Sequence, residues 1–211
     1  MVIDLSPQTL INAYCQGVFP MGDESGQVNW YEADPRGVLP FESFHIPHDL
    51  RRILKQNRFE VTLNRDFLSV IRGCSKSRSS TWITEDIIEA YGLLHKMGYA
   101  HSVEAWREGE LAGGLYGVAV GGAFFGESMF FRTRDASKAA LAHLAYWLMS
   151  SEFLLFDIQM VTDLLSRFGA QLISKRAYLQ ILNHAVAVER EIRPRFIDWK
   201  LSLIHISEPT R

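Results

Sequence analysis

The stretch HSVEAWREGELAGGLYGVAVGGAFFGESMFF, residues 101–131, decides the fold of this chain. It is rich in valine and aromatic residues, which favour strands, and glycines interrupt it at Gly109 and Gly121. Glycine is typical of the tight turns that join neighbouring antiparallel strands. The stretch therefore predicts two or three antiparallel strands with turns near these two glycines.

The segments on either side predict helices and one buried strand. Residues 84–98 begin with a threonine cap and early acidic residues and end in Lys96 and Gly98, as helix capping and charge preferences require. Residues 136–151 have a long, mostly apolar helix pattern, and FLLFDIQM at 153–160 has the apolar run of a strand buried on both faces. Further helices are predicted at 8–16, 48–57, 66–74, 162–169 and 175–188, strands at 38–41 and 58–63, and an irregular stretch at 17–37. This order predicts a mixed α/β sheet with helices on its faces.

The composition indicates one large domain, or one domain with a small accessory lobe. The chain has 211 residues, 47% of them hydrophobic, and a formal net charge of −2. That charge excludes a globally basic nucleic-acid binder, so a polyanion would need a local basic patch. Cys15 and Cys74 have neither redox nor metal-ligand spacing, which fits a reducing cytoplasm.

The two ends of the chain carry no functional motif. The N-terminus lacks the pattern of a secretory signal, and no apolar run is long enough to span a bilayer, so we expect a soluble protein with no membrane partner. The segment LSLIHISEPTR, 201–211, continues no pattern and resembles translated vector sequence. We therefore predict that it is a non-native tail and exclude it from functional reasoning.

Two polar side chains stand inside the predicted buried strand. Asp157 and Gln159 are two residues apart, so they project from the same face of a regular strand with about 7 Å of rise between them. Because a buried polar group costs free energy unless it has a partner, they either serve one site or close a structural hydrogen-bond network. Glu127, among four phenylalanines, has the same two interpretations, and an ion pair with Arg132 is the structural one.

Aromatic and basic residues supply further candidates. Trp82 and Tyr91 could stack on a base, although aromatic residues pack in cores more often. Six basic residues could form a phosphate-binding patch, or a solvated surface, from the polar side of one helix and the loop at 75–80. They are Arg51, Arg52, Lys55, Arg58, Lys76 and Arg78. His45 and His48 are the only close histidine pair and have no evident third ligand, so no metal site is predicted.

Five segments resemble the leucyl/phenylalanyl-tRNA:protein transferase family. They are YCQGVFPM, GCSKSRSSTWIT, the block from Gly98 to Arg132, DASKAAL and FDIQMVTDLLSRFGA, in the family's order over roughly residues 4–180. The resemblance implies transfer of Leu or Phe, and less readily Met, from aminoacyl-tRNA to proteins that begin with Arg or Lys. In bacteria this transfer marks them for degradation under the N-end rule. It also implies an acetyltransferase-like (GNAT-like) catalytic domain at 46–200 after a small N-terminal domain at 1–45, acting as a cytoplasmic monomer.

The family's functional residues fall on matching positions of this chain. Its catalytic Asp and Gln fall on Asp157 and Gln159, its essential Glu on Glu127, and the aromatic pair beside the 3′-terminal aminoacyl-adenosine on Trp82 and Tyr91. Its apolar amino-acid pocket falls on Leu115, Phe124, Leu141, Leu144, Leu148 and Phe156. Phe124 and Glu127 have opposite parity in a regular strand, so both face one site only if Gly126 permits a bulge or the pocket wraps around the strand.

At three places the chain departs from the family's pattern. Met21 stands where many members have a Trp that contacts the adenosine, so that contact is weaker here or comes from another residue such as Trp30. Leu164 replaces a common His, and 173–175 read Ile-Ser-Lys in place of Ile-Pro-Arg. These changes affect fine positioning more than the reaction.

The implied chemistry needs few catalytic groups. An aminoacyl ester is already activated, and an N-terminal amine with a pKa near 7.7 to 8.0 loses its proton at a cost of about 1 to 1.5 kcal/mol at pH 7. No cofactor is therefore expected, and positioning supplies most of the rate. The mechanistic hypothesis is that Asp157 orients and polarises Gln159, whose amide holds the attacking amine, while Glu127 organises the site.

Two other classes of function stay open. An acyl-CoA-dependent acetyltransferase would need a Gly-rich turn before a helix to bind pyrophosphate, and RTRDASK at 132–138 contains no glycine. A non-catalytic tRNA-binding module could use the basic patch alone but would have no use for Asp157, Gln159 and Glu127 together.

Overall fold

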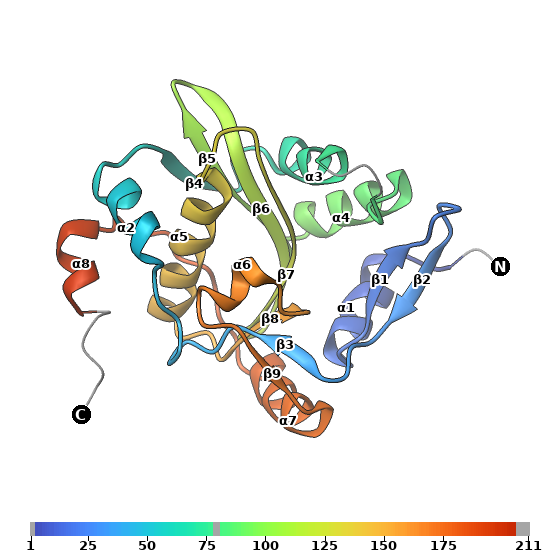
Figure 1. Ribbon diagram of the computed structural model, residues 1–211. Helices are drawn as coiled ribbons and strands as arrows, with labels where there is room; N and C mark the ends of the chain where they lie inside the picture. The colour runs from blue at the N-terminus through green and yellow to red at the C-terminus, as the bar shows by residue number, and fades with distance from the viewer. Residues whose placement is uncertain (1–2, 78–80, 206–211) are drawn as a thin grey trace.

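The quoted stretch forms the centre of one large sheet. The computed structural model describes residues 3–77 and 81–205 (Figure 1). Strands β5 (Ala100–Arg107), β6 (Glu110–Val120) and β7 (Ala123–Phe131) pair antiparallel in sequence order. Gly109 and Gly121 turn between them with φ of 81° and 57°, in the left-handed region that favours glycine. The predicted three-stranded unit and both of its turns are confirmed.

Four more strands complete a seven-stranded sheet in the order β4-β5-β6-β7-β8-β3-β9. They are β3 (Arg36–Val38), β4 (Glu60–Leu63), β8 (Leu155–Gln159) and β9 (Gln171–Ile173). The sheet is antiparallel except for the pair β7 and β8, which is parallel. Strand β8 is buried along its whole length, as predicted. Strand β3 comes from the predicted N-terminal domain, and β9 was not predicted.

Helices cover both faces of this sheet (Figure 1). On one face α2 (His48–Lys55) and α5 (Ala136–Ser150) pack into one hydrophobic cluster, and on the other α3 (Phe67–Lys76) and α4 (Glu85–Lys96) pack into a second. The Thr84 hydroxyl accepts a hydrogen bond from the amide of Ile87, which confirms the predicted cap of α4. The result is an α+β sheet flanked by helices.

The N-terminal segment is more regular than its glycines and prolines predict. Helix α1 (Pro7–Cys15) begins after a Ser6 cap, as expected. Residues 17–37, predicted to be irregular, contain the antiparallel pair β1 (Phe19–Gly22) and β2 (Val28–Tyr31) and the start of β3. The correction has a physical reason: β1 pairs only with β2 and gains little from local propensity, but Phe19 and Val28 bury their side chains in the core.

Three helices close the chain. They are α6 (Asp163–Ser166), α7 (Lys175–Val186) and α8 (Trp199–His205). Helix α8 includes the first residues of the predicted non-native tail, and the Trp199 indole donates a hydrogen bond to Nε2 of His143 on α5 at 3.1 Å. Within the described part of the chain, no helix combines the length and apolar character needed to cross a membrane.

Candidate active site

A cavity opens where β7 and β8 separate. The two strands pair only from Ala123 to Phe125, opposite Leu155 to Asp157, and then diverge. In the partner strand β6, Gly117 lies opposite Gly126 and Tyr116 lies opposite Ser128, so Glu127 is the extra residue of a β-bulge. The bulge turns the Glu127 carboxyl toward the cavity. The bulge raised as a condition by the parity of Phe124 and Glu127 is present, but of these two residues Glu127 alone lines the cavity.

The cavity has a volume of about 270 Å³ and a mostly apolar lining. Its polar residues, Glu127, Ser128, Gln159 and Thr162, come from the diverging ends of β7 and β8 and the loop that follows β8. Its apolar lining comprises Phe19, Met21, Trp82, Leu115, Met129, Leu141, Phe156, Ile158, Met160, Leu164 and Leu165. An apolar side chain can enter this space while a polar group attached to it stays near the two strand ends.

The structure divides the predicted apolar pocket into two layers. Leu115, Leu141 and Phe156 line the cavity. Phe124, Leu144 and Leu148 are fully buried in the same core cluster and outside the lining. The Phe124 ring stands edge-on to that of Phe156, with centroids 5.5 Å apart, so it supports the cavity wall and does not form its surface.

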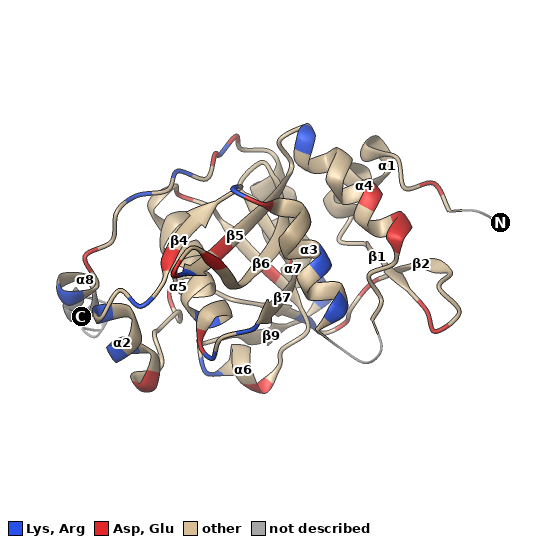
Figure 2. Cartoon of the chain, turned by 90° about the horizontal axis from the view of Figure 1, so that it is seen from above, with Lys and Arg blue, Asp and Glu red and all other residues tan. Residues whose placement is uncertain are grey.

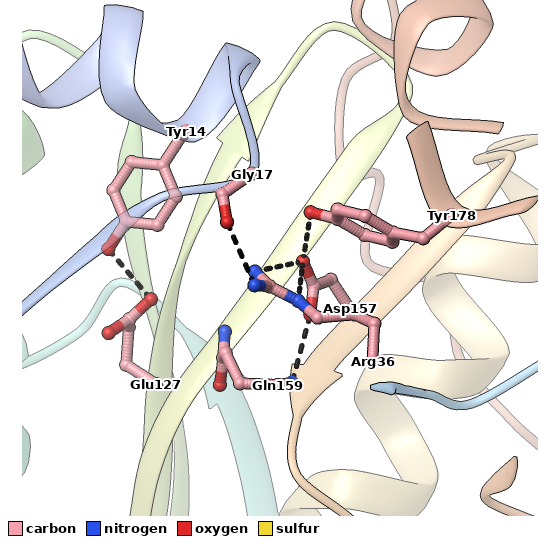
Figure 3. Close-up of polar contacts among 7 residues, drawn as sticks. All are labelled: Tyr14, Gly17, Arg36, Glu127, Asp157, Gln159 and Tyr178. Carbon is pink, nitrogen blue, oxygen red and sulfur yellow. Dashed lines mark hydrogen bonds and ion pairs between the residues drawn. The ribbon is translucent and has the colours of Figure 1, made fainter. Parts of the chain in front are cut away.

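Asp157 is completely buried and its charge is matched by Arg36 (Figure 3). Arg36 Nε lies 3.0 Å from Oδ1 and Nη2 lies 2.8 Å from Oδ2, and the Tyr178 hydroxyl donates to Oδ2 at 2.6 Å. Burial alone would lower the pKa of Arg36, but the hydrogen bonds and negative charge of Asp157 raise it. Burial and the same negative charge raise the pKa of Tyr178. Arg36 therefore stays cationic and Tyr178 stays a neutral donor, and Arg36 and Asp157 form a buried ion pair.

Gln159 is fixed by its main chain and by its amide. Its backbone N–H donates to Asp157 Oδ1 at 2.9 Å, and its φ of 55° places it in the left-handed region. The hydrogen-bond network assigns the side-chain nitrogen to the carbonyls of Gly126 at 2.9 Å and Ile158 at 3.1 Å. Asp157 thus orients Gln159 through the backbone. The hypothesis that Asp157 polarises the side-chain amide of Gln159 is corrected, because that amide donates to the carbonyls of Gly126 and Ile158 instead.

Glu127 has two tyrosines as partners, of which Figure 3 shows Tyr14, and it forms no ion pair with any of the residues that the structure describes. The Tyr14 hydroxyl donates to Oε1 at 2.7 Å, Tyr91 lies 3.5 Å from Oε2, and the two hydroxyls hydrogen-bond each other. Burial raises the pKa of Glu127 to about 8; the Tyr14 hydrogen bond opposes this and the charge of Asp157 adds to it. Arg132 instead donates to the carbonyl of Leu111, so the expected alternative of an ion pair with Glu127 is not found.

The two predicted stacking residues differ in position. Trp82 lines the cavity next to β1, where its carbonyl accepts a hydrogen bond from the Gly22 amide. Tyr91 is fully buried, with its ring edge-on to Tyr116, so it has no free face for a base. The structure therefore corrects its predicted role from stacking to holding Glu127. Met21 lines the cavity, whereas Trp30 lies outside the lining.

The predicted basic patch is split between the two faces of the sheet (Figure 2). Arg51, Arg52, Lys55 and Arg58 are on or just after α2, whereas Lys76 ends α3 on the opposite face. Arg78 lies outside the described residues. Helix α2 is tied to α6, which lines the cavity, because Arg167 donates to Asp49 at 2.8 Å. The α2 part therefore adjoins the cavity through α6. The end of α3 adjoins it from the other face, because the Ser75 hydroxyl donates to the carbonyl of Ile83, next to Trp82 of the lining.

Sequence reasoning missed Arg36, Tyr178 and Tyr14. Two of their partners are remote, since Arg36 and Asp157 are 121 residues apart and Tyr14 and Glu127 are 113 apart, whereas Tyr178 and Asp157 are 21 apart. One available signal was the cost of burying Asp157, which requires a cation or several donors. Arg36, in a short strand between Pro35 and Gly37, was a candidate for that cation.

An apolar cavity edged by a titratable carboxyl and a fixed carboxamide is the arrangement expected of an enzyme active site. The chain belongs to the leucyl/phenylalanyl-tRNA protein transferase family, whose model matches residues 38–183 and whose N-terminal domain model matches residues 3–34.

Curated relatives carry the same name. A leucyl/phenylalanyl-tRNA–protein transferase of Salinibacter ruber is 52% identical over 192 residues, covering 90% of this chain and 84% of the relative. That of Akkermansia muciniphila is 47% identical, covering 86% of this chain and 96% of its own, and that of Gloeobacter violaceus is 46% identical, covering 92% and 100%.

One solved structure is a distant neighbour. L-PGS from Bacillus licheniformis superposes with a TM-score of 0.43 and 13% identity over 85% of this chain and 70% of its own. Similarity at this level supports no fold assignment, so the acetyltransferase-like fold stays a prediction.

Proposed function

We propose that this chain transfers leucine or phenylalanine, and less readily methionine, from an aminoacyl-tRNA to the α-amine of a protein N-terminus, and that the reaction takes place in the cavity between β7 and β8. The observation that carries the proposal is the apolar cavity bordered by Glu127 and Gln159 in a chain of this family. The amine nitrogen attacks the ester carbonyl carbon and loses a proton, and a peptide bond forms. The bond to the tRNA ribose oxygen breaks, and that oxygen takes up a proton and leaves as a hydroxyl. The ammonium proton must leave before attack.

We propose that Glu127, which lines the cavity, receives that proton. Its pKa of about 8 lies close to the 7.7 to 8.0 of a free α-amine, so the transfer is nearly isoenergetic. At pH 7 roughly a tenth of the carboxyl is ionised. The Tyr14 hydroxyl stabilises this carboxylate through its hydrogen bond. We propose that the carboxylate takes a proton from the amine and becomes a carboxylic acid. The proton comes from the entering ammonium or, when the amine enters neutral, from the nitrogen as it attacks.

Gln159 is placed to position the amine. Its amide nitrogen is engaged by Gly126 and Ile158, which leaves the amide oxygen as the group that can accept a hydrogen bond from an incoming N–H. Positioning of this kind supplies up to several powers of ten in rate. Replacing Gln159 by Ala should therefore lower transfer far more than it lowers aminoacyl-tRNA binding, and equal losses of both would contradict this role.

The cavity lining sets the amino-acid preference. An apolar pocket discriminates a missing methylene by only about 1 to 3 kcal/mol and rejects an added hydroxyl by a factor of about a hundred. Leu and Phe should be preferred over Val and Tyr, with measurable leakage. Competition among charged tRNAs measures this order. Efficient transfer of Tyr would contradict the proposal that the side chain of the transferred amino acid binds against Leu115, Leu141 and Phe156.

We propose that the tRNA backbone follows the basic side of α2. Arg52, Lys55 and Arg58 are exposed there, and the Arg167–Asp49 ion pair joins α2 to the helix that lines the cavity. Reversing the charges of Arg52 and Arg58 should raise the KM for aminoacyl-tRNA and reduce its salt dependence by about one ion per lost contact. The same change should leave a 3′-aminoacyl-adenosine substrate unaffected. Reversal of Lys76 on the opposite face tests separately whether the α3 side also contacts the tRNA.

We propose a small N-terminal domain at 1–45 and an acetyltransferase-like catalytic domain at 46–200, acting as a monomer. The separate β1–β2 pair and the separate family models for 3–34 and 38–183 support the division. The mixed sheet with helices on both faces supports the fold of the larger domain. We place the protein in the cytoplasm because charged tRNA is available there.

The deciding experiment mixes the purified protein with Leu-tRNA and peptides that differ only in their first residue. We propose acceptors that begin with Arg or Lys, so labelled leucine should appear on those peptides. Transfer only to peptides that begin with Asp or Glu would overturn the acceptor assignment, and absence of transfer to every peptide would overturn the function. A coenzyme A titration tests the acetyltransferase alternative, which family membership does not favour.

A further inference from the structure

One buried guanidinium contacts both sides of the candidate active site. Arg36 is only 1% exposed. Its Nε and Nη2 bind the Asp157 carboxylate, and its Nη1 donates to the carbonyl of Gly17 at 2.8 Å. The group also lies between two rings, 4.9 Å from the centroid of Phe19 and 4.6 Å from that of Tyr178. All of these contacts are made inside the protein.

These contacts lead to two separate parts of the cavity lining. Gly17 precedes β1, whose Phe19 and Met21 line one wall. Asp157 accepts the backbone N–H of Gln159, which lines the other wall at the end of β8. Arg36 therefore connects the wall from the N-terminal segment with the residue proposed to hold the amine.

The surroundings leave little room for another arrangement. A Cβ atom at Gly17, where φ is 77°, would lie 2.7 Å from Cε1 of Tyr178. A Cβ atom at Gly37, next to Arg36, would lie 2.8 Å from the Met160 carbonyl carbon. Both glycines allow the backbone to pack closely against the residues around Asp157 and Gln159. A small displacement of Arg36 would therefore also displace β1 and Gln159, which both line the cavity.

We propose that Arg36 is a positioning residue for the transfer reaction: its planar guanidinium sets the separation of the β1 wall from the end of β8 and, through Asp157, the place of Gln159. The inference rests on the proposed function. Lysine could supply the charge but not the rigid fork that binds a carboxylate through two nitrogens and a carbonyl through the third. The geometry of Arg36, and not its charge alone, is what the reaction requires.

The first test is Arg36→Lys in the full chain. A misplacement of about 1 Å can cost roughly 100-fold in rate, so kcat for leucine transfer per mole of folded protein should fall by about 10- to 100-fold. The KM for Leu-tRNA should change by less than about threefold, because the basic side of α2 and the apolar lining are untouched. A kcat per folded protein equal to that of the wild type would overturn the proposal.

Arg65→Lys is the matched control. Arg65 also combines an ion pair, with Glu60 at 3.2 Å, and a ring contact, 4.4 Å from the Trp106 centroid, but it lies at β4 and β5, away from the cavity lining. Its kcat should equal that of the wild type. If the wild type itself transfers no leucine, the proposed function fails; if it transfers and Arg36→Lys does so equally well, only this inference fails.

The second test separates geometry from charge balance. Arg36→Gln with Asp157→Asn removes both buried charges and keeps side chains of similar size. The midpoint of thermal unfolding should recover toward the wild-type value relative to Asp157→Asn alone, because no buried charge stays unpaired. The kcat should stay at least about tenfold below wild type, because the guanidinium fork is absent. Recovery of both stability and kcat would show that Arg36 serves only to balance Asp157.

Discussion

The two acids of the site, Asp157 and Glu127, are on neighbouring strands but have opposite surroundings, since Asp157 is fully buried and Glu127 is half-buried. Asp157 is bound by the Arg36 guanidinium and the Tyr178 hydroxyl. Glu127 contacts the Tyr14 and Tyr91 hydroxyls, and burial raises its pKa to about 8. A buried carboxyl with a cation partner stays ionised, whereas one with neutral donors is ready to exchange a proton near neutral pH.

The two acids therefore have different roles in one site: Asp157 holds the structure around Gln159, and Glu127 can exchange a proton with the substrate. Asp157 does not reach the cavity lining, and both of its oxygens are bound by Arg36, by the Tyr178 hydroxyl and by the backbone N–H of Gln159. It orients the main chain of Gln159 instead. Glu127 lines the cavity and has a pKa close to that of an amine substrate. Variants of the two acids should therefore fail in different ways.

The largest expected effect is on stability at Asp157. Asp157→Asn leaves Arg36 buried without its counter-charge and should lower the free energy of unfolding by about 3 to 5 kcal/mol. Glu127→Gln replaces a carboxyl that is mostly neutral at pH 7, so its loss should stay near 1 kcal/mol. Urea denaturation at pH 7 measures both. Similar losses in the two variants would remove the distinction between the acids.

The next effect is on the rate at Glu127. Glu127→Gln should lower kcat for transfer by roughly 100-fold or more at pH 8, the size of a lost general base. With an acceptor amine of much lower pKa, which is neutral over the whole range, wild-type kcat should still rise as pH passes about 8 because Glu127 ionises. The Gln variant should have a flat profile. If kcat rose with pH in the same way in the wild type and in Glu127→Gln, the rise would come from a group other than Glu127.

The sequence predicted most of the sheet because its signals are local. The turns at Gly109 and Gly121 and the cap at Thr84 each depend on residues within a few positions. The bulge at Glu127 was also foreseen as a condition, because Phe124 and Glu127 cannot share a face in a regular strand. Short strands such as β9 gave no such signal, since their pairing is set by partners far along the chain.

The candidate site was predicted only as far as its motif residues. Asp157, Gln159, Glu127 and Trp82 border or support one cavity, but the arginine that sets the charge of Asp157 lies 121 residues earlier. The misassigned role of Tyr91 has the same origin. Its hydroxyl meets that of Tyr14 across 77 residues, a contact that no local pattern encodes.

A third effect concerns stability against pH. Because the native state holds the Glu127 proton up to about pH 8 and the unfolded chain loses it near 4.5, the native state binds more protons in between. The free energy of unfolding should therefore fall between about pH 5 and 9 in the wild type relative to Glu127→Gln. Burial lowers the pKa of His101 and His143 to about 4, so both proteins should also lose stability as pH falls below 6.5. The difference between the two curves isolates Glu127, and a constant difference would show that its pKa is the same in both states.

The smallest effect compares two tyrosine hydroxyls. Tyr178→Phe removes a hydrogen bond to a charged carboxylate and should cost about 1.5 to 3 kcal/mol, whereas Tyr14→Phe removes one to a mostly neutral carboxyl and should cost about 0.5 to 1.5 kcal/mol at pH 7. The Tyr14 hydroxyl lowers the pKa of Glu127, so its removal should move the rising limb of the pH–rate profile upward. Tyr178→Phe should leave that limb in place, because it touches Asp157 and not Glu127. A shift of the limb in the Tyr178 variant would mean that the two acids share their protons, and the division between a fixed charge and an exchangeable one would then have to be abandoned.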